Sequence, residues 1–403
     1  MTKPYQHQWR VLTILFLAWG IGGLARNSIA YLFPYFSLEF NLGSEHTGFL
    51  ASTVAFFWAV SIMLCGRLVD KWGQPKVMIP GMAIGALFLA AFGLSQSVVM
   101  LYGFAALFGL FLGSFCAPSL SMIAEQSDPK NRGLFIGVMQ SGFTLIGAAV
   151  GSVVITKLGE TMGWRSSYFI MAAVVVLLVI IMVFSIGKIK RPSLSDHDQQ
   201  AVKASYGQVL KYKNVKIATV LTCLTMMWFF TVSAFAIVYL IEAKGYSPVA
   251  AGAIFAGFGL GGFLGEATVP AISDNIGRKL TLIICSMVSL LAYGAFLFLD
   301  VSSMVLTVLL FVSAYFFAGM MPISVSVIPS ESVSEQLVPT ATALTPAVGE
   351  MMGGVVSPSL GGICIGFIGV AGVMKVLLIA PILIMIGALA LSETAPRVLA
   401  RKG

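Results

Sequence analysis

Two long apolar runs are joined by the charged segment Gly66-Arg67-Leu68-Val69-Asp70-Lys71-Trp72-Gly73-Gln74-Pro75-Lys76. A related segment, Ser273-Asp274-Asn275-Ile276-Gly277-Arg278-Lys279, joins two later apolar runs. In both segments a Gly follows the Asp by three residues, and both residues recur after 204 positions (274 − 70 and 277 − 73). Because this offset is about half of the 403-residue chain, the sequence predicts two copies of one structural design.

A second repeat supports this interpretation. Three positions occupied by glycine recur after 207 residues, twice as glycine and once as proline. The pairs are Gly142 with Gly349, Gly147 with Gly354, and Gly151 with Pro358.

The composition excludes an ordinary soluble domain. Hydrophobic residues make up 58% of the chain and charged residues only 10%, whereas soluble domains have about 25% charged residues. The mean hydropathy is +0.95, and apolar runs of about 18 residues or more, long enough to cross a bilayer, recur along the chain. We therefore predict an all-α integral membrane protein with twelve transmembrane helices, at residues 11–35, 47–66, 77–96, 98–123, 133–156, 166–187, 215–241, 248–271, 280–299, 302–328, 338–366 and 370–391.

The predicted helices form two pseudo-symmetric six-helix bundles, residues 1–187 and 215–403. The one long polar interruption, residues 188–214, lies between them and is predicted to be a cytoplasmic linker. Most of the Lys and Arg residues fall on the side of this linker and of both termini, which is the cytoplasmic side by the positive-inside rule. Four basic residues fall in the outer loops: Lys157, Arg165, Lys244 and Lys375.

The remaining composition argues against other classes of protein. The net charge of +8 comes from short loops between spans, so it does not indicate nucleic-acid binding. The five cysteines lie in apolar runs without paired spacing or a nearby His, so neither disulfides nor a metal site is predicted. No phosphate-binding glycine loop and no Ser/His/Asp constellation occurs, so we expect no cofactor and no enzyme activity.

The segment that begins at Gly66 follows the pattern G-x-L-x-D-x-x-G-x-x-K/R, and Gly163-Trp164-Arg165 stands before the sixth span. Together with the echo at Asp274, these features resemble the major facilitator superfamily of transporters. The resemblance implies that the two loops control the switch between conformational states without contacting substrate. The residues to which this role is carried over are Gly66, Asp70, Gly73, Lys76, Asp274, Gly277 and Arg278.

Arg26 is the one basic residue placed deep in a span. Counting from Val11 at ~1.5 Å per residue puts it ~22 Å into the membrane, where a charge normally faces a cavity or a partner. Its guanidinium group could anchor a substrate carboxylate, or it could form a structural ion pair or extend toward the membrane surface. The polar and aromatic residues predicted to line the substrate site with it are Asn27, Tyr31, Gln140, Trp228, Tyr239 and Tyr315.

Two acidic residues are comparably deep. Glu266 precedes Asp274 by eight residues, and Glu350 lies about twelve residues into the eleventh span. A buried carboxyl group has a raised pKa and can carry a proton, so we predict that Glu266, with Glu350 second, couples transport to protons. The alternative for Glu350 is a hydrogen bond between helices.

Arg26, Tyr31 and Pro34 resemble the first helix of the anion:cation symporter branch of the superfamily. The chain departs from that branch at Ala25, Gly109 and Cys116, where charged residues often stand, and it has Glu266 where related monocarboxylate carriers have arginine. The resemblance implies a proton-coupled carrier of a small carboxylate-bearing anion or zwitterion in a bacterial inner membrane, working by alternating access. The expected partners are the substrate, protons and the lipid bilayer, and the expected state is a monomer. The alternative is proton-driven efflux of drugs or amphiphiles.

Overall fold

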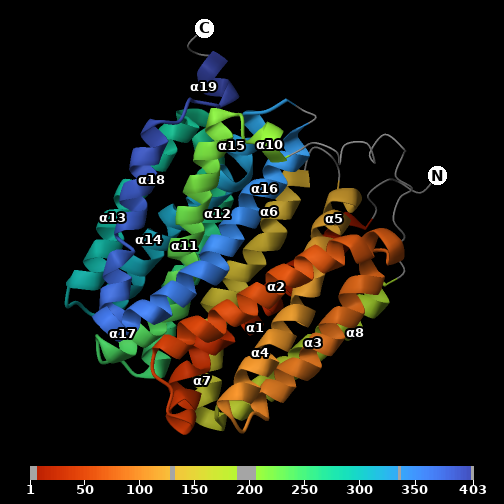
Figure 1. Ribbon diagram of the computed structural model, residues 1–403, viewed down its shortest axis with the longest axis vertical. Coiled ribbons are helices and arrows are strands. Elements are labelled where there is room, and N and C mark those ends of the chain that lie inside the picture. Colours follow the sequence, from red (N-terminus) through yellow and green to blue (C-terminus); the bar gives the residue numbers. More distant parts are fainter. Residues whose placement is uncertain (1–6, 128–131, 188–205, 335–336, 401–403) are drawn as a thin grey trace. The chain divides into compact units, whose positions relative to one another are not determined.

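The computed structural model describes residues 7–127, 132–187, 206–334 and 337–400. These residues form helices joined by short connections, and no β-strand occurs among them. The chain forms two compact units (Figure 1). Unit 1 comprises Met1–Ser193 with Ser247–Gly252, and unit 2 comprises Leu194–Tyr246 with Ala253–Gly403. The predicted linker, residues 188–214, lies outside the described residues up to residue 205, and its boundaries stay a prediction.

Unit 1 contains the helices coloured from red to yellow in Figure 1. They are α1 Gln8–Phe40, α2 Glu45–Trp72, α3 Gln74–Gly93, α4 Val98–Leu112, η1 Gly113–Phe115, α5 Cys116–Gln126, α6 Arg132–Gly142, η2 Phe143–Val150, α7 Gly151–Met162 and α8 Trp164–Ser185.

The helices coloured from green to blue follow, and all but the start of α12 belong to unit 2. They are α10 Tyr206–Val209, α11 Lys213–Glu242, α12 Pro248–Ile276, α13 Arg278–Phe298, α14 Ser303–Pro322, η4 Ile323–Val327, α15 Ile328–Glu331, α16 Val338–Glu350, η6 Met351–Val356, α17 Ser357–Val376, α18 Ile379–Leu389 and α19 Pro396–Ala400.

The described residues contain eleven helical stretches long and apolar enough to cross a membrane, and a shorter apolar helix, Ile379–Leu389. The last long stretch, Thr340–Val376, runs through Gly369, whose φ of 68° and ψ of 170° are not helical. Two predicted spans, 338–366 and 370–391, therefore meet at this glycine. The predicted all-α fold with twelve membrane helices is confirmed.

Four glycines with positive φ form tight joints between successive spans. Gly73, Gly163, Gly277 and Gly369 have φ values between 68° and 103° and ψ values between 150° and 170°. This region is essentially restricted to glycine, because a Cβ atom strains it. Gly277 follows Gly73 by 204 residues and Gly369 follows Gly163 by 206, so the repeat in the sequence is also a repeat of backbone conformation.

Glycines also let helices approach closely within unit 2. Three glycines spaced by four residues occupy one side of α12, and a Cβ atom on any of them would collide with a backbone carbonyl oxygen of α14. Small residues at this spacing are typical of close helix packing in membranes. Gly257, Gly261 and Gly265 lie against the carbonyls of Thr307, Phe311 and Tyr315, respectively.

The spans are interrupted at matching places in the two units. The fifth span contains the π-helical segment η2, and the eleventh contains the π-helical segment η6, which begins 208 residues later (351 − 143). The glycines of the second sequence repeat lie in and around these two segments. π-Helical turns are rare, and they are often found at functional sites.

Substitution Gly163→Ala should lower the midpoint of thermal denaturation in detergent, because alanine at a φ of 81° costs on the order of 1–3 kcal/mol. No neighbouring atom lies within 4 Å of a Cβ at this position, so backbone strain is the main cause. The control is Gly103→Ala in α4, which also meets no atom within 4 Å but lies in a helix, where alanine is the better residue. Equal midpoints for the two variants would contradict the strained-joint explanation.

Candidate functional site

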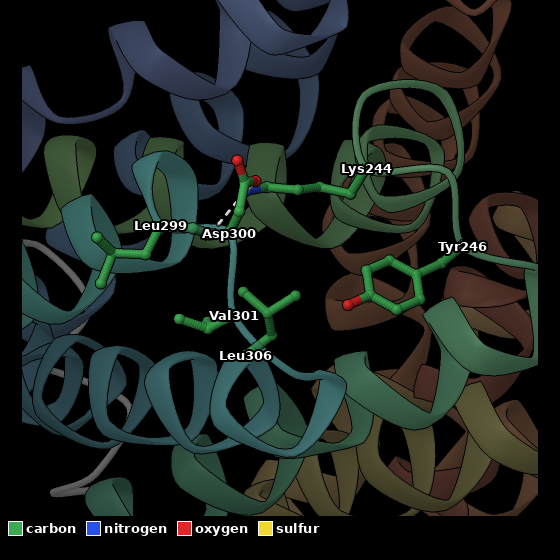
Figure 2. A pocket seen from close by; sticks show the side chains of 6 residues that line it. All are labelled: Lys244, Tyr246, Leu299, Asp300, Val301 and Leu306. Carbon is green, nitrogen blue, oxygen red and sulfur yellow. Dashed lines mark hydrogen bonds and ion pairs between the residues drawn. The ribbon is translucent and has the colours of Figure 1, made fainter.

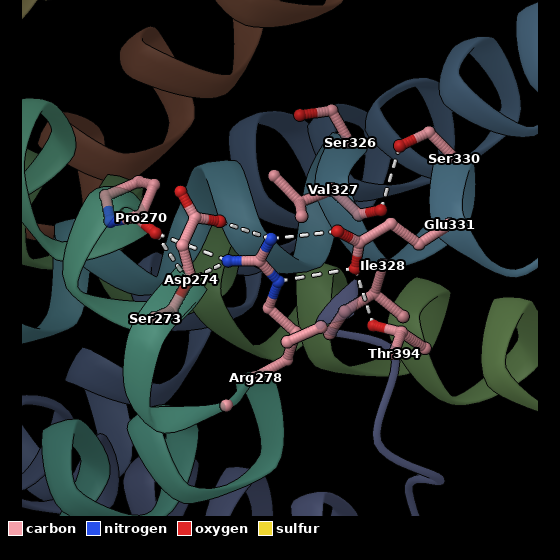
Figure 3. A network of polar contacts seen from close by, with 12 residues as sticks. Pro270, Ser273, Asp274, Arg278, Ser326, Val327, Ile328, Ser330, Glu331 and Thr394 are labelled. Carbon is pink, nitrogen blue, oxygen red and sulfur yellow. Dashed lines mark hydrogen bonds and ion pairs between the residues drawn. The ribbon is translucent and has the colours of Figure 1, made fainter. Parts of the chain in front are cut away.

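A cluster of polar residues surrounds Arg278 where α12 ends and α13 begins, and we call it the Arg278 cluster (Figure 3). The side chain of Arg278 is only 4% exposed. Its Nη2 lies 2.5 Å from Asp274 Oδ1 and 2.8 Å from Glu331 Oε1, and its Nε donates to Glu331 Oε2 at 3.3 Å. Its Nη1 donates to the hydroxyl of Ser273 and, at 3.3 Å, to the carbonyl oxygen of Pro270.

These contacts tie several segments of unit 2 together. Glu331, at the end of α15, binds the guanidinium group through both oxygens, which is the strongest geometry for this pair. The Thr394 hydroxyl, beyond α18, donates to Glu331 Oε2 at 2.7 Å. Loss of Arg278 would leave two carboxylates close together, so the cluster depends on this residue.

Glu393 caps the N-terminus of α13. Gly277 precedes that helix and has no side chain to accept its first N–H groups. Instead, Glu393 Oε1 accepts from the backbone N–H of Arg278 at 2.8 Å, and Oε2 accepts from that of Lys279 at 3.3 Å. Partial burial of the carboxyl group acts to raise its pKa, but hydrogen bonds from four backbone N–H groups hold the pKa of Glu393 below its ordinary value.

Unit 1 repeats the joint with different polar chemistry. Gly73 has the backbone conformation of Gly277, and Gln74 stands where Arg278 stands in unit 2. The amide Nε2 of Gln74 donates to Glu125 Oε2 at 2.8 Å. The side chain of Asp70 lies outside what the structure describes. The other residues of the predicted switch, Gly66 and Lys76, lie on α2 and α3.

Arg26 lies on α1 beside an aromatic cluster within unit 1. Its guanidinium carbon is 5.6 Å from the ring centroid of Trp58, on α2, which is a cation–π distance. The Phe115 ring, from η1, makes edge-on contacts with Trp58 at 5.7 Å and with Trp19 at 5.4 Å. The Trp19 indole N–H donates to the Ser119 hydroxyl at 3.0 Å, which fixes the orientation of the cluster. We call Arg26 with Trp19, Trp58 and Phe115 the Arg26 cluster.

The two neighbours of Arg26 predicted to line the site are buried. Asn27 is 7% exposed, and its amide Nδ2 has no hydrogen-bond partner in the described part of the chain. Tyr31 is completely buried, and its hydroxyl donates to the carbonyl oxygen of Gly147, in η2, at 2.9 Å. Tyr31 therefore joins α1 to the π-helical segment of the fifth span, and its role as a substrate contact stays a prediction.

Three aromatic residues predicted for the site contact neighbouring helices within unit 2. Trp228 is fully buried, and its ring stacks on that of Phe317 at 4.0 Å. The Tyr239 hydroxyl donates to the carbonyl oxygen of Leu297 at 3.0 Å. The Tyr315 hydroxyl lies 2.7 Å from that of Thr268, on α12.

The predicted proton-coupling residues are half-buried. Glu266 lies on α12, one residue beyond the glycine that packs against the Tyr315 carbonyl. Glu350 is the last residue of α16 and directly precedes η6. Gln140, also half-buried, lies on α6 shortly before η2. The structure thus places Gln140 and Glu350 next to the matching π-helical segments of the two units.

Sequence reasoning misses several residues of these clusters. Glu331, Glu393 and Thr394 fall outside the predicted spans and receive no role there, although they bind the Arg278 cluster directly or cap its helix. In the sequence they are only polar residues near the ends of spans, which is a weak indication of a role. Trp19 and Phe115 give no signal beyond ordinary membrane composition.

Comparison with known proteins places these features in a family. A sequence model described as the Major Facilitator Superfamily matches residues 15–349. A probable 4-methylmuconolactone transporter from Cupriavidus pinatubonensis is 25% identical over 311 residues, which cover 75% of this chain and 71% of that protein. A hexuronate transporter from Bacillus subtilis is 26% identical over 278 residues, which cover 67% of this chain and 65% of that protein.

The fold is similar to that of a transporter of known structure. The crystal structure of a bacterial homologue of the human lysosomal transporter Spinster, inward-facing and unoccupied, matches with a TM-score of 0.77. The match covers 97% of both chains at 16% identity, so it bears on the fold alone.

Substitution Glu393→Gln should lower the thermal midpoint at pH 7, and the difference from the wild type should shrink below about pH 4. The folded-state pKa of Glu393 is lowered, so the carboxylate stabilises the fold above the unfolded-state pKa, and this contribution is lost as the pH falls through the folded-state pKa. Midpoints measured in detergent across this pH range check it. The control is Glu160→Gln, which removes an exposed ion pair with Lys157 and should change the midpoint little. A difference that stays constant with pH would contradict the capping role.

Proposed function

The chain belongs to the major facilitator superfamily of membrane transporters, and on this basis we propose that it moves a small organic acid across the bacterial inner membrane by alternating access. The observation that supports the substrate class is the Arg26 cluster: a guanidinium group held in a membrane span against the face of an aromatic ring. Both termini are proposed to lie in the cytoplasm, as the distribution of basic residues predicts.

Arg26 is the proposed anchor for the substrate carboxylate. A guanidinium group donates two parallel hydrogen bonds to a carboxylate, and such charge-assisted bonds are strong where water is scarce. The rings of Trp19, Trp58 and Phe115 would favour an acid with a flat or unsaturated body. The buried amide of Asn27, the residue after Arg26, is a candidate second donor.

The names of the two relatives agree with this chemistry. Hexuronate is a sugar acid, and 4-methylmuconolactone is a small unsaturated lactone that carries a carboxyl group. Their substrates share a carboxylate and differ in the rest of the molecule. A site in which one arginine provides the charge and aromatic rings provide the walls could serve this class.

Proton coupling is proposed to depend on Glu266, with Glu350 second. A carboxyl group in a membrane span costs less when protonated, so it can take up a proton on one side and release it on the other. The Arg278 cluster is proposed to stabilise one of the two conformational states, because its ion pairs would have to separate or rearrange for α12 and α13 to move against α15.

Purified wild-type protein should be stabilised against heat by a carboxylate from a panel that also contains amino acids and lipophilic cations. Substitution Arg26→Ala should weaken that ligand by about ten- to a hundredfold, the cost of losing a hydrogen bond to a charged group, and Arg26→Lys by less. The control Lys157→Ala removes an exposed charge on the α7 surface and should leave the ligand effect unchanged. Stabilisation by lipophilic cations alone, equally strong in Arg26→Ala, would replace this proposal with drug or amphiphile efflux.

Substitution Glu266→Gln should abolish uphill accumulation of the substrate driven by a proton gradient in liposomes. Substrate exchange across the same membrane should continue, because glutamine keeps the side-chain shape and loses only the titratable proton. Glu350→Gln tested in the same way separates a proton-coupling residue from a structural one. If both variants kept gradient-driven uptake, the proposed coupling would be wrong.

A further inference from the structure

The loop after α11, the loop between α13 and α14 and the start of α14 line a half-open pocket of about 210 Å³ within unit 2 (Figure 2). This is the volume of about seven water molecules, enough for one small ring with a carboxylate. The side chains that line it are Lys244, Tyr246, Leu299, Asp300, Val301 and Leu306. By the predicted orientation of the chain, these residues lie on the outer side of the membrane, away from the Arg278 cluster.

The backbone around the pocket is held in place by hydrogen bonds. Gly245 has a φ of 73°, and its N–H binds the carbonyl of Ile241 at 3.1 Å, which ends α11 in the common left-handed glycine cap. The N–H of Tyr246 binds the carbonyl of Leu240 at 3.0 Å. Tyr239, seven residues before Tyr246, anchors the facing helix end by donating a hydrogen bond to the Leu297 carbonyl. The pocket walls are therefore preorganised.

Lys244 provides the positive charge of the pocket. Its ammonium group donates to the carbonyl oxygen of Leu299 at 2.9 Å and to Asp300 Oδ1 at 3.1 Å, and an ammonium group has three protons to donate. The side chain of Lys244 is 11% exposed, whereas that of Asp300 is 97% exposed. The ion pair with Lys244 is weak, because the Asp300 carboxylate is almost fully exposed to solvent. The carboxylate of a ligand can therefore replace that of Asp300.

The rest of the pocket suits a small planar molecule. Leu299 is 48% exposed and Val301 is half-buried, so these two side chains supply the apolar surface, and the buried Leu306 supports it from below. Tyr246 lies across the pocket from this surface, with its hydroxyl turned toward the interior (Figure 2). Lys375 adds a second positive charge to this end of unit 2, since its Nζ lies 5.6 Å from the ring centroid of Phe298, which precedes Leu299.

We propose that this pocket is a second, low-affinity binding site for the transported organic acid, which captures the acid at the outer face before transport. The carboxylate binds the Lys244 ammonium group in place of Asp300, the ring packs on Val301 and Leu299, and the Tyr246 hydroxyl binds a polar substituent of the ring. The inference rests on the proposed substrate class and adds a site distinct from Arg26.

The test measures binding of benzoate and 4-hydroxybenzoate to the full-length protein in detergent by saturation-transfer NMR. It is made in an Arg26→Ala background, so that the proposed transport site does not contribute. Lys244→Ala should weaken benzoate binding about fivefold or more. Asp300→Asn should strengthen it up to about fivefold, because the competing carboxylate is gone. Tyr246→Phe should weaken 4-hydroxybenzoate and leave benzoate unchanged.

The opposite effects of the two charge variants separate binding from structure. If the Lys244–Asp300 pair only stabilised the loop, Lys244→Ala and Asp300→Asn would act in the same direction, and the proposal would be wrong. Complete loss of benzoate binding in Arg26→Ala alone would also overturn the pocket but would support the proposed function. A third outcome would support the pocket and reject Arg26 as the anchor. In it, Arg26→Ala leaves both benzoate binding and substrate transport intact, and Lys244→Ala abolishes the binding.

Discussion

The hydrocarbon core of a bilayer offers no hydrogen-bond partners, so every backbone amide that crosses it must bind another part of the chain. This constraint produces a helical structure, and it also governs how successive helices are joined. A sharp turn beside the membrane leaves helix ends with unpaired groups, which must be satisfied by side chains, by other backbone groups or by water. Gly73, Gly163, Gly277 and Gly369 turn the chain in a single residue and so keep these ends short.

The same constraint explains why Glu393 is important. Gly277 makes the turn possible because it has no side chain, and for that reason it cannot cap α13. A carboxylate from the segment beyond α18 supplies the missing acceptors, while its neighbour Thr394 binds Glu331. The joint between α12 and α13 therefore depends on a residue more than a hundred positions later, and folding of unit 2 must bring its two ends together.

The elements that the sequence predicts well are those set by local physical chemistry. Hydropathy determines the spans, and the need for positive φ determines Gly73 and Gly277. The sequence also identifies Asp274 and Arg278 as residues of one loop, although their ion pair crosses the joint at Gly277 and is not an interaction along a single helix. Glu331 and Phe115 cannot be found in this way, since their contacts join helices distant in the sequence. Tyr31 and Trp228 are predicted as site residues because a polar aromatic side chain looks the same in a sequence whether it faces a cavity or a neighbouring helix.

The joints at Gly73 and Gly277 have the same backbone conformation but different polar side chains. Such differences allow two copies of one design to have different functions. Gln74 binds Glu125 through one hydrogen bond from a neutral amide, whereas Arg278 binds Glu331 through a charged, two-pronged contact. Positive charge deep in the spans follows the same logic: Arg26, in unit 1, is the one basic residue predicted to lie deep in a span, and it lies beside aromatic rings. A carrier must hold its substrate less firmly than a receptor does, because the substrate must also leave. In the proposed function, one deep arginine with apolar walls would provide enough attraction to select an acid and little enough to release it.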